Sequence, residues 1–291
     1  AGTIEAARVL SKYKFDNSII YVGLSGEEQG LLGGKSLASY AKKKGWEIIG
    51  VLNNDMIGNI EGVDGVIDNR SFRIFSEPFS FNPKYANGLN MRTQGGENDG
   101  LSRQLARYVH KTVRKYMPEL NPIMIYRLDR FGRGGHHRPF NDEGFAGIRI
   151  MEAHENYIRQ HNDIRNENGI DYGDVLSGVN FDYAAKLTSV NAISLASIAS
   201  SPKPPQNLKI GGIVEPSVRF RWEQPDDSSI IGYKIYWRET TSSTWEYSKT
   251  IGLVDNYILE GIVIDNFIFG VSSINSEGYE SLVVFPGSTF R

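Results

Sequence analysis

The stretch at residues 21–34, YVGLSGEEQGLLGG, joins a strand pattern to a helix pattern and carries two adjacent carboxylates between them. The apolar run at residues 19–24 predicts a buried strand, and residues 31–44 predict a helix. Strand geometry does not require two like charges at a strand end. A cation facing Glu27 and Glu28 would offset their repulsion, but glutamates at a helix start are also favoured by the helix dipole. The pair alone leaves both interpretations open.

Outward from this stretch, strand and helix patterns alternate over residues 1–199. Helical patterns lie at 4–13, 31–44, 99–117 and 181–200, and strand patterns at 18–24, 47–54, 71–76, 122–128 and 146–153. Such alternation predicts an α/β domain, a three-layer αβα fold with a mixed, largely parallel sheet. Sheets of this kind bind ligands at the carboxyl ends of their strands.

The pattern changes after SSPKPP, residues 200–205, which we interpret as a stiff polar linker. Residues 206–291 contain short alternating strands separated by turn residues, which predicts an all-β sandwich. With Trp222, Tyr233, Tyr236 and the segment FIFGVSSINSEGYES, this part resembles a fibronectin type III domain. Phe267 stands where that family usually has a tyrosine. The resemblance implies the fold and leaves the role of the domain open.

Composition excludes several classes of function. The net charge is −2, from 32 Lys and Arg against 34 Asp and Glu, so there is no electrostatic footprint for nucleic acid. No apolar run is long enough to cross a bilayer. Cysteine is absent, which removes disulfides, thiolate metal sites and a cysteine nucleophile together. The chain opens directly on a helical pattern, and we expect the natural protein to extend further upstream.

Three separated clusters place oxygen or nitrogen ligands after predicted strands: Glu27 with Glu28, Asp55 in LNNDMIGN, and a histidine-rich region at residues 133–165 that contains His161. Carboxylate and imidazole together suit zinc, and a set without cysteine suits a catalytic site. A zinc-bound water is a nucleophile near neutral pH, and a carboxylate that is not a ligand can take its proton. Capping, turn and surface roles are the alternatives that the spacing leaves open.

The motifs GLSGEEQGLLGGKSLASY, GVLNNDMIGN and AGIRIMEAHENYIRQHNDIR resemble the M28 metallopeptidases, the co-catalytic dizinc aminopeptidase family, over residues 1 to about 198. The resemblance implies a zinc exopeptidase fold, N-terminally incomplete here, and peptide substrates. It implies that Glu27 is the general base, that Glu28 and His161 bind one zinc, and that Asp55 binds the other.

Two further residues carry weaker implications. His137, in GGHHRPF, matches a histidine beside the cleft, as a substrate or supporting residue, and His136 replaces the aspartate that usually precedes it. Tyr157 is a candidate donor to the tetrahedral oxyanion. The family's tyrosine usually lies beside the last histidine, where this chain has Gln160.

The sequence also departs from the family. Its His-x-Asp motif and the aspartate that bridges both metals are absent from this chain. We therefore expect the polypeptide alone to bind one zinc ion or none tightly and to have little or no activity, unless a missing or cleaved upstream segment supplies those ligands. Apolar sheet surface should then be exposed.

The sequence thus favours a zinc-dependent aminopeptidase, extracellular or periplasmic, represented by the C-terminal part of its catalytic domain. A catalytically silent binding or scaffold module is the alternative. A carboxypeptidase, or a glutaminyl cyclase with a single zinc, could use the same scaffold.

Overall fold

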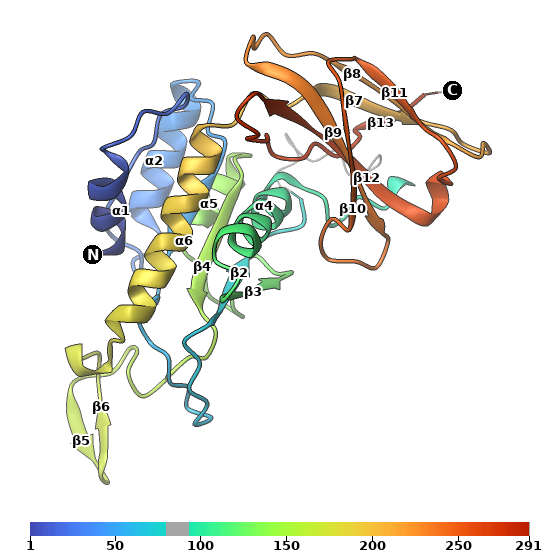
Figure 1. Cartoon of the computed structure of the whole chain (residues 1–291). Helices are drawn as coiled ribbons and strands as arrows, with labels where there is room; N and C mark the ends of the chain where they lie inside the picture. Colours follow the sequence, from blue (N-terminus) through green and yellow to red (C-terminus); the bar gives the residue numbers. More distant parts are fainter. Residues whose placement is uncertain (80–92, 291) are drawn as a thin grey trace.

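The structure is a computed structural model of the chain, and it describes residues 1–79 and 93–290. Helices and a sheet form the N-terminal part, and β-strands form the C-terminal part (Figure 1). The Gly- and Asn-rich composition of residues 80–99 predicts a long loop, and its residues 80–92 lie outside the described residues.

The sheet of the N-terminal part has the strand order β1-β4-β2-β3. Its strands are β1 (Val51–Asn54), β4 (Gly147–Glu152), β2 (Ser71–Phe75) and β3 (Asn121–Ile125). The β1–β4 and β2–β3 pairs are parallel, whereas β2 runs antiparallel to β4. The prediction of a mixed, largely parallel sheet is therefore confirmed.

Helices cover both faces of this sheet (Figure 1). On one face α4 (Leu101–Tyr116) packs against α6 (Phe181–Ala199), and α1 (Gly2–Leu10) packs against α6. On the other face α5 (His137–Asp142) contacts β1 and β4, and α2 (Leu32–Lys43) packs against α5. This is the predicted three-layer arrangement.

Strand β4 shows how the layers are assigned. Ile148 and Ile150 are fully buried and join the core formed with α4 and α6. Side chains alternate along a strand, so Arg149 points to the opposite face, where α5 lies. The β4 strand therefore carries a buried charge on the face that leads to the predicted site.

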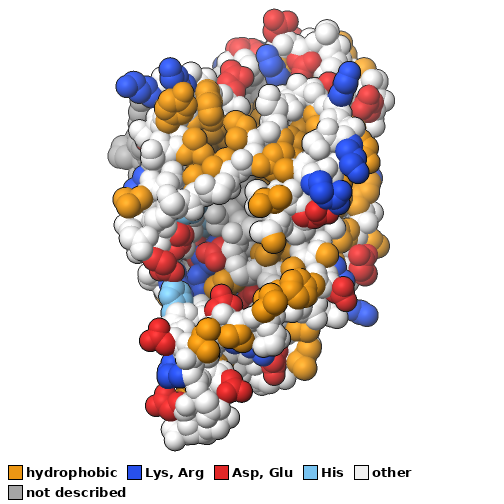
Figure 2. Space-filling view, turned by 90° about the vertical axis from the view of Figure 1, so that its left-hand side faces the viewer, with side chains coloured by type: hydrophobic (Ala, Val, Ile, Leu, Met, Phe, Trp, Pro, Cys, Tyr) orange, Lys and Arg blue, Asp and Glu red, His pale blue; other side chains and the backbone are white. Residues whose placement is uncertain are grey.

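Residues 18–24 differ from the prediction of a buried strand. They form no ladder with any described residue, and Ile20 and Val22 are 60% and 39% exposed. The predicted strand at 47–54 is reduced to β1, which lies at the edge of the sheet. An extended segment becomes a strand only when a neighbour pairs with its backbone, and apolar pattern alone does not supply that neighbour. Figure 2 shows the molecule from the left-hand side of Figure 1, and hydrophobic side chains reach the surface on that face.

The C-terminal part is the predicted β-sandwich. One sheet has the order β10-β9-β12 and the other the order β11-β8-β7-β13. The strands are β7 (Gln206–Gly211), β8 (Val218–Glu223), β9 (Ile230–Glu239), β10 (Tyr247–Ile251), β11 (Asn256–Leu259), β12 (Phe267–Asn275) and β13 (Ser288–Thr289). Trp222 and Tyr233 pack in its core with their ring centroids 5.0 Å apart. Phe267 begins β12 and packs edge-on against Tyr247.

Short elements complete the chain. The hairpin β5 (Arg165–Glu167) and β6 (Ile170–Tyr172) projects from the N-terminal part, and two 3₁₀ turns are η1 (Leu176–Gly178) and η2 (Ile264–Asn266) (Figure 1). Within residues 1–79 and 93–290, no helix has both the length and the apolar character needed to cross a membrane.

The two parts are joined by buried contacts as well as by the chain. Helix α6 ends at Ala199, β7 begins at Gln206, and the backbone oxygen of Ser200 accepts a hydrogen bond from Asn275 at 3.0 Å.

The strongest of these contacts is the Asp99 cluster, in which one aspartate lies between two arginines. Arg107 of α4 is 2.8 Å and Arg238 of β9 is 2.7 Å from the Asp99 carboxylate, and all three side chains are at most 3% exposed.

Candidate metal centre

A tight turn holds the two glutamates that precede α2. The backbone N–H groups of Gly30 and Leu31 donate to the Glu27 carbonyl oxygen at 3.1 and 2.9 Å. Leu31 has a φ of 64°, in the left-handed region. A Cβ at Gly33 would lie 2.7 Å from a backbone oxygen, so only glycine fits there. The turn thereby fixes the Glu27 backbone, while the Glu28 side chain remains 66% exposed.

Asp55 leaves the sheet at the carboxyl end of β1. Its N–H still donates to the Ile150 carbonyl oxygen of β4, at 3.3 Å. The next residue, Met56, has a φ of 58°. Left-handed backbone at a non-glycine residue costs energy and is found preferentially at functional sites. The chain therefore turns sharply where the sheet presents the Asp55 carboxylate.

Arg149 organises the carboxylates behind this edge. Its Nη2 forms an ion pair with Asp55 Oδ2 at 2.7 Å, and its Nη1 lies 2.9 Å from both carboxylate oxygens of Asp129. Arg149 is fully buried and the Asp129 side chain is 1% exposed, whereas the Asp55 side chain is 32% exposed. We call Asp55, Arg149 and Asp129 the Arg149 cluster. A buried guanidinium requires such partners.

Glu27 lies close enough to this cluster for its ionisation to be affected. Partial burial raises the pKa of the Glu27 carboxyl, and the charges of Asp55 and Glu28 raise it further. Arg149 acts in the opposite direction but does not cancel these effects. A carboxylate that holds a proton more firmly than usual is a better general base.

Glu28 and His161 form the second pair that the structure brings together. His161 Nε2 lies 3.5 Å from Glu28 Oε1, and the two side chains are 51% and 66% exposed. His161 has a φ of 56°, so its backbone is also in the left-handed region. Imidazole and carboxylate at this separation can supply two of the ligands of one zinc ion.

His137 lies behind the site. It is fully buried, its Nε2 is 2.8 Å from the Leu128 carbonyl oxygen, and burial lowers its pKa to about 4. Its Nε2 is 3.8 Å from Asp129. A side chain with no exposed surface is not placed to contact a substrate, so of its two predicted roles the geometry fits the supporting one.

Tyr157 and His136 differ in their surroundings. The Tyr157 side chain is on the surface, with 56% of the residue exposed, and its role toward an oxyanion stays a prediction. His136 is 8% exposed, and burial lowers the pKa of its ring although Asp55 acts to raise it. The structure therefore puts the His136 ring close enough to Asp55 for their charges to interact.

The donor set fits part of a zinc centre and not a complete one. Within residues 1–79 and 93–290, no three His, Asp or Glu side chains lie together in a way that could hold a metal ion. Glu28 and His161 form a two-donor pair, and one carboxylate oxygen of Asp55 is engaged by Arg149. Since zinc in proteins takes at least three protein ligands, further ligands would be needed.

Sequence reasoning missed Arg149 and Asp129. The signal was present, because AGIRIMEA places one arginine in the middle of a buried strand, and a buried arginine requires an acidic partner. The sequence pattern could not have identified Asp129 as the acidic partner of Arg149. Arg130 has a side chain that is only 12% exposed, and it pairs with Glu155 at 2.8 Å.

Acidic, basic and histidine side chains gather near one another on this side of the molecule (Figure 2). A cavity of about 260 Å³ lies elsewhere, where the two parts of the chain meet. The predicted metal ligands do not line that cavity.

Known proteins resemble this chain in sequence. The sequence model of peptidase family M28 matches residues 1–175. A probable zinc metalloprotease of the fungus Phaeosphaeria nodorum is 34% identical over 289 residues, which are 98% of this chain and 58% of that protein. One from Pyrenophora tritici-repentis is 34% identical over 289 residues and 67% of its length is covered. The chain thus spans about three-fifths to two-thirds of these relatives.

Solved structures resemble its two parts separately. An aminopeptidase from Aneurinibacillus sp. strain AM-1 matches 67% of this chain and 37% of its own, with a TM-score of 0.42 and 16% identity. The fn3 domain of human collagen alpha-1(XX) matches 30% of this chain and 82% of its own, with a TM-score of 0.26 and 20% identity.

Proposed function

This chain belongs to peptidase family M28, and we propose that it carries part of the catalytic centre of a zinc-dependent aminopeptidase. The substrates would be peptides, from which the enzyme removes N-terminal residues. The chain's own share would be the general base, one complete ligand pair and one ligand of a second zinc ion.

Each side chain has a defined role in this proposal. Glu27 takes the proton of the attacking water and passes it to the leaving amine. Glu28 and His161 would bind one zinc, and Asp55 would bind the other. Zinc, when bound, would polarise the scissile carbonyl and make the water acidic enough to be deprotonated near neutral pH.

The observation that carries the proposal is the position of Glu27. Three carboxylates from two separate loops converge there, and burial together with Asp55 and Glu28 raises the pKa of Glu27. A protein has little reason to hold like charges together unless a cation or a transferable proton is part of the site.

The rest of the centre would come from outside the described residues. The relatives are longer than this chain, and we propose that an additional segment, contiguous or cleaved but associated, supplies the missing ligands. Two zinc ions would then bind, whereas this chain alone would hold one or none tightly. An extracellular or periplasmic location is part of the same proposal, and fractionation of source cells tests it.

The ion pair between Asp55 and Arg149, at 2.7 Å, favours one alternative. An aspartate engaged by a buried arginine can persist without any metal. The chain would then be a catalytically silent module that keeps the peptidase fold and binds partners through its sandwich.

Zinc content and hydrolysis of amino-acid anilides distinguish the two functions. The protein carrying the additional segment should bind two zinc equivalents and hydrolyse the anilide, and Glu27→Gln should reduce kcat about 10²- to 10⁴-fold while zinc stays bound. Glu47→Gln, an exposed residue of the same part, is the matched control. Absence of zinc and activity from the longer protein would favour the silent module.

A further inference from the structure

The cavity between the two parts of the chain lies at the end of β4 that is remote from Glu27. Because β2 runs antiparallel to β4, the residues that follow β2 reach the Gly147 end of β4. Ser102 Oγ donates to the Gly147 carbonyl oxygen at 2.6 Å and accepts from the Glu77 N–H at 3.1 Å. Glu77 and Ser102 both line this cavity of about 260 Å³.

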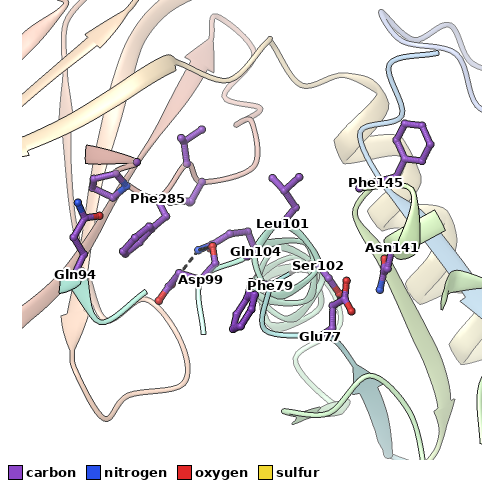
Figure 3. A pocket seen from close by; sticks show the side chains of 16 residues that line it. Glu77, Phe79, Gln94, Asp99, Leu101, Ser102, Gln104, Asn141, Phe145 and Phe285 are labelled. Atoms are coloured by element: carbon purple, nitrogen blue, oxygen red, sulfur yellow. Dashed lines mark hydrogen bonds between the residues drawn. The ribbon is translucent and has the colours of Figure 1, made fainter. Parts of the chain in front are cut away.

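Apolar side chains from both parts of the chain form much of its wall. Leu101, at the start of α4, and Phe145, which precedes β4, come from the N-terminal part, and Phe285 comes from the sandwich (Figure 3). Leu101 is 59% exposed. Pockets at domain boundaries commonly combine such walls with a few polar groups that orient a ligand.

The buried polar groups of the cavity are acceptors. Gln104 is 2% exposed and its Nε2 donates to Asp99 at 3.0 Å, so its Oε1 is the free atom, without a hydrogen-bond partner. Asn141 is 1% exposed and its Nδ2 donates to the Gly147 carbonyl oxygen at 3.2 Å, so its Oδ1 is likewise without a partner. A ligand that satisfies these atoms must donate hydrogen bonds.

Glu77 adds a carboxyl group to these acceptors. It is 7% exposed, and its carboxylate oxygens have no hydrogen-bond or ion-pair partner within the described part of the chain. Burial raises the pKa of Glu77 to about 7, the charge of Asp142 adds to this, and Arg103 and Arg138 act in the opposite direction. In Figure 3 the Glu77 carboxyl lies on the side of α4 that faces Asn141. A cation in contact would relieve the cost of ionising Glu77.

We propose that this cavity binds a small organic ammonium ion. Its ammonium group pairs with the Glu77 carboxylate and the Asn141 carbonyl oxygen, and its apolar body lies against Leu101 and Phe145. The cavity volume of about 260 Å³ suits a molecule no larger than a single amino-acid side chain with its amine. This site is separate from the proposed peptidase centre, and its test does not depend on zinc or hydrolysis.

Calorimetric titration of the full chain with 2-phenylethylamine and with the neutral analogue 2-phenylethanol tests the proposal. The amine should bind about tenfold tighter than the alcohol or more, because only the amine can form a charge-assisted pair with Glu77. Glu77→Gln should weaken amine binding by about tenfold or more. Glu119→Gln, an exposed residue near the end of α4, should leave it unchanged.

Two further measurements test whether the amine binds in this cavity. Amine affinity should rise between pH 6 and 8, as Glu77 ionises while an aliphatic amine stays protonated. Leu101→Ala, at an exposed position, should weaken the amine without altering thermal unfolding. Equal affinity for amine and alcohol, undiminished binding by Glu77→Gln, or no saturable binding would each overturn the proposal.

Discussion

The Arg149 cluster and the Asp99 cluster are three-residue charge groups built in opposite order. In the first, one buried arginine lies between two aspartates, and Asp55 is still 32% exposed. In the second, one fully buried aspartate lies between two arginines, and none of the three side chains is more than 3% exposed. Within its three residues the first group has an excess negative charge at an edge open to solvent, although Arg130 Nε also lies 3.6 Å from Asp129. The second group has an excess positive charge enclosed between the two parts of the chain.

This difference distinguishes a cluster that solvent and ions can reach from one that is closed in the interface between the two parts of the chain. Excess negative charge at an open edge can attract a cation and can raise the pKa of a neighbour such as Glu27. The enclosed cluster has no such access. Arg107 of α4 also donates to the Ser243 carbonyl oxygen of the sandwich, and this hydrogen bond fixes the sandwich against α4. Arg238 donates to the Ser242 carbonyl oxygen within the sandwich, which holds its guanidinium in place. The sandwich is therefore an integrated part of the molecule and not a loosely tethered module.

The largest expected effect comes from breaking the enclosed cluster. Asp99→Asn should lower the free energy of unfolding by about 3–5 kcal/mol, because two buried arginines lose their shared counter-ion. Denaturant unfolding measures this, and Glu97→Gln, two residues away and exposed, is the control. A loss below about 1 kcal/mol would show that the cluster does not stabilise the joint.

The open cluster should tolerate the equivalent change better. Arg149→Met should cost about 2–3 kcal/mol, since Asp129 loses a buried partner while water can solvate the freed Asp55 carboxylate. The same unfolding measurement gives the difference between the two variants. If Arg149→Met were the more damaging change, solvent access at Asp55 would not be what distinguishes the clusters.

Much of this comparison could not be predicted from the sequence. The pattern of AGIRIMEA identified β4, and the motifs identified Glu27, Glu28, Asp55 and His161 as candidates, because local spacing and short motifs carry that information. The partners Asp129 and Asp99 are long-range contacts, and no local rule selects them among the other acidic residues. Residues 18–24 were misassigned for the same reason, since strand formation depends on a neighbour and not on apolar pattern alone.

Zinc binding tests the solvent-accessible side of the comparison, where Glu28 and His161 lie. At zinc concentrations near ten times Kd, the chain should gain about 1.4 kcal/mol in free energy of unfolding if Glu28 and His161 bind the ion. His161→Ala should abolish this gain, whereas His154→Ala should not, because His154 lies with Asp64 at 3.2 Å. A gain that survives His161→Ala would place the bound zinc elsewhere.

The smallest effects should be opposite dependences of stability on pH. Burial raises the pKa of Glu152, at the end of β4, to about 8, so the folded chain keeps a proton that the unfolded chain releases near 4.5. Stability from this group is full below pH 4.5 and falls as pH rises toward 8. Burial alone would also raise the pKa of Glu280 at the interdomain joint, but Lys111, Tyr236 and Lys234 outweigh it and hold the pKa below 4.5.

Glu280 therefore contributes stability above pH 4.5 that is lost as pH falls. Glu152→Gln should flatten the decline between pH 4.5 and 8, and Glu280→Gln the decline on the acid side, each by about 1 kcal/mol per pH unit or less. Thermal unfolding followed across pH 3 to 9 resolves both slopes. Two variants that flatten the same side of the pH profile would contradict the opposite pKa shifts of Glu152 and Glu280.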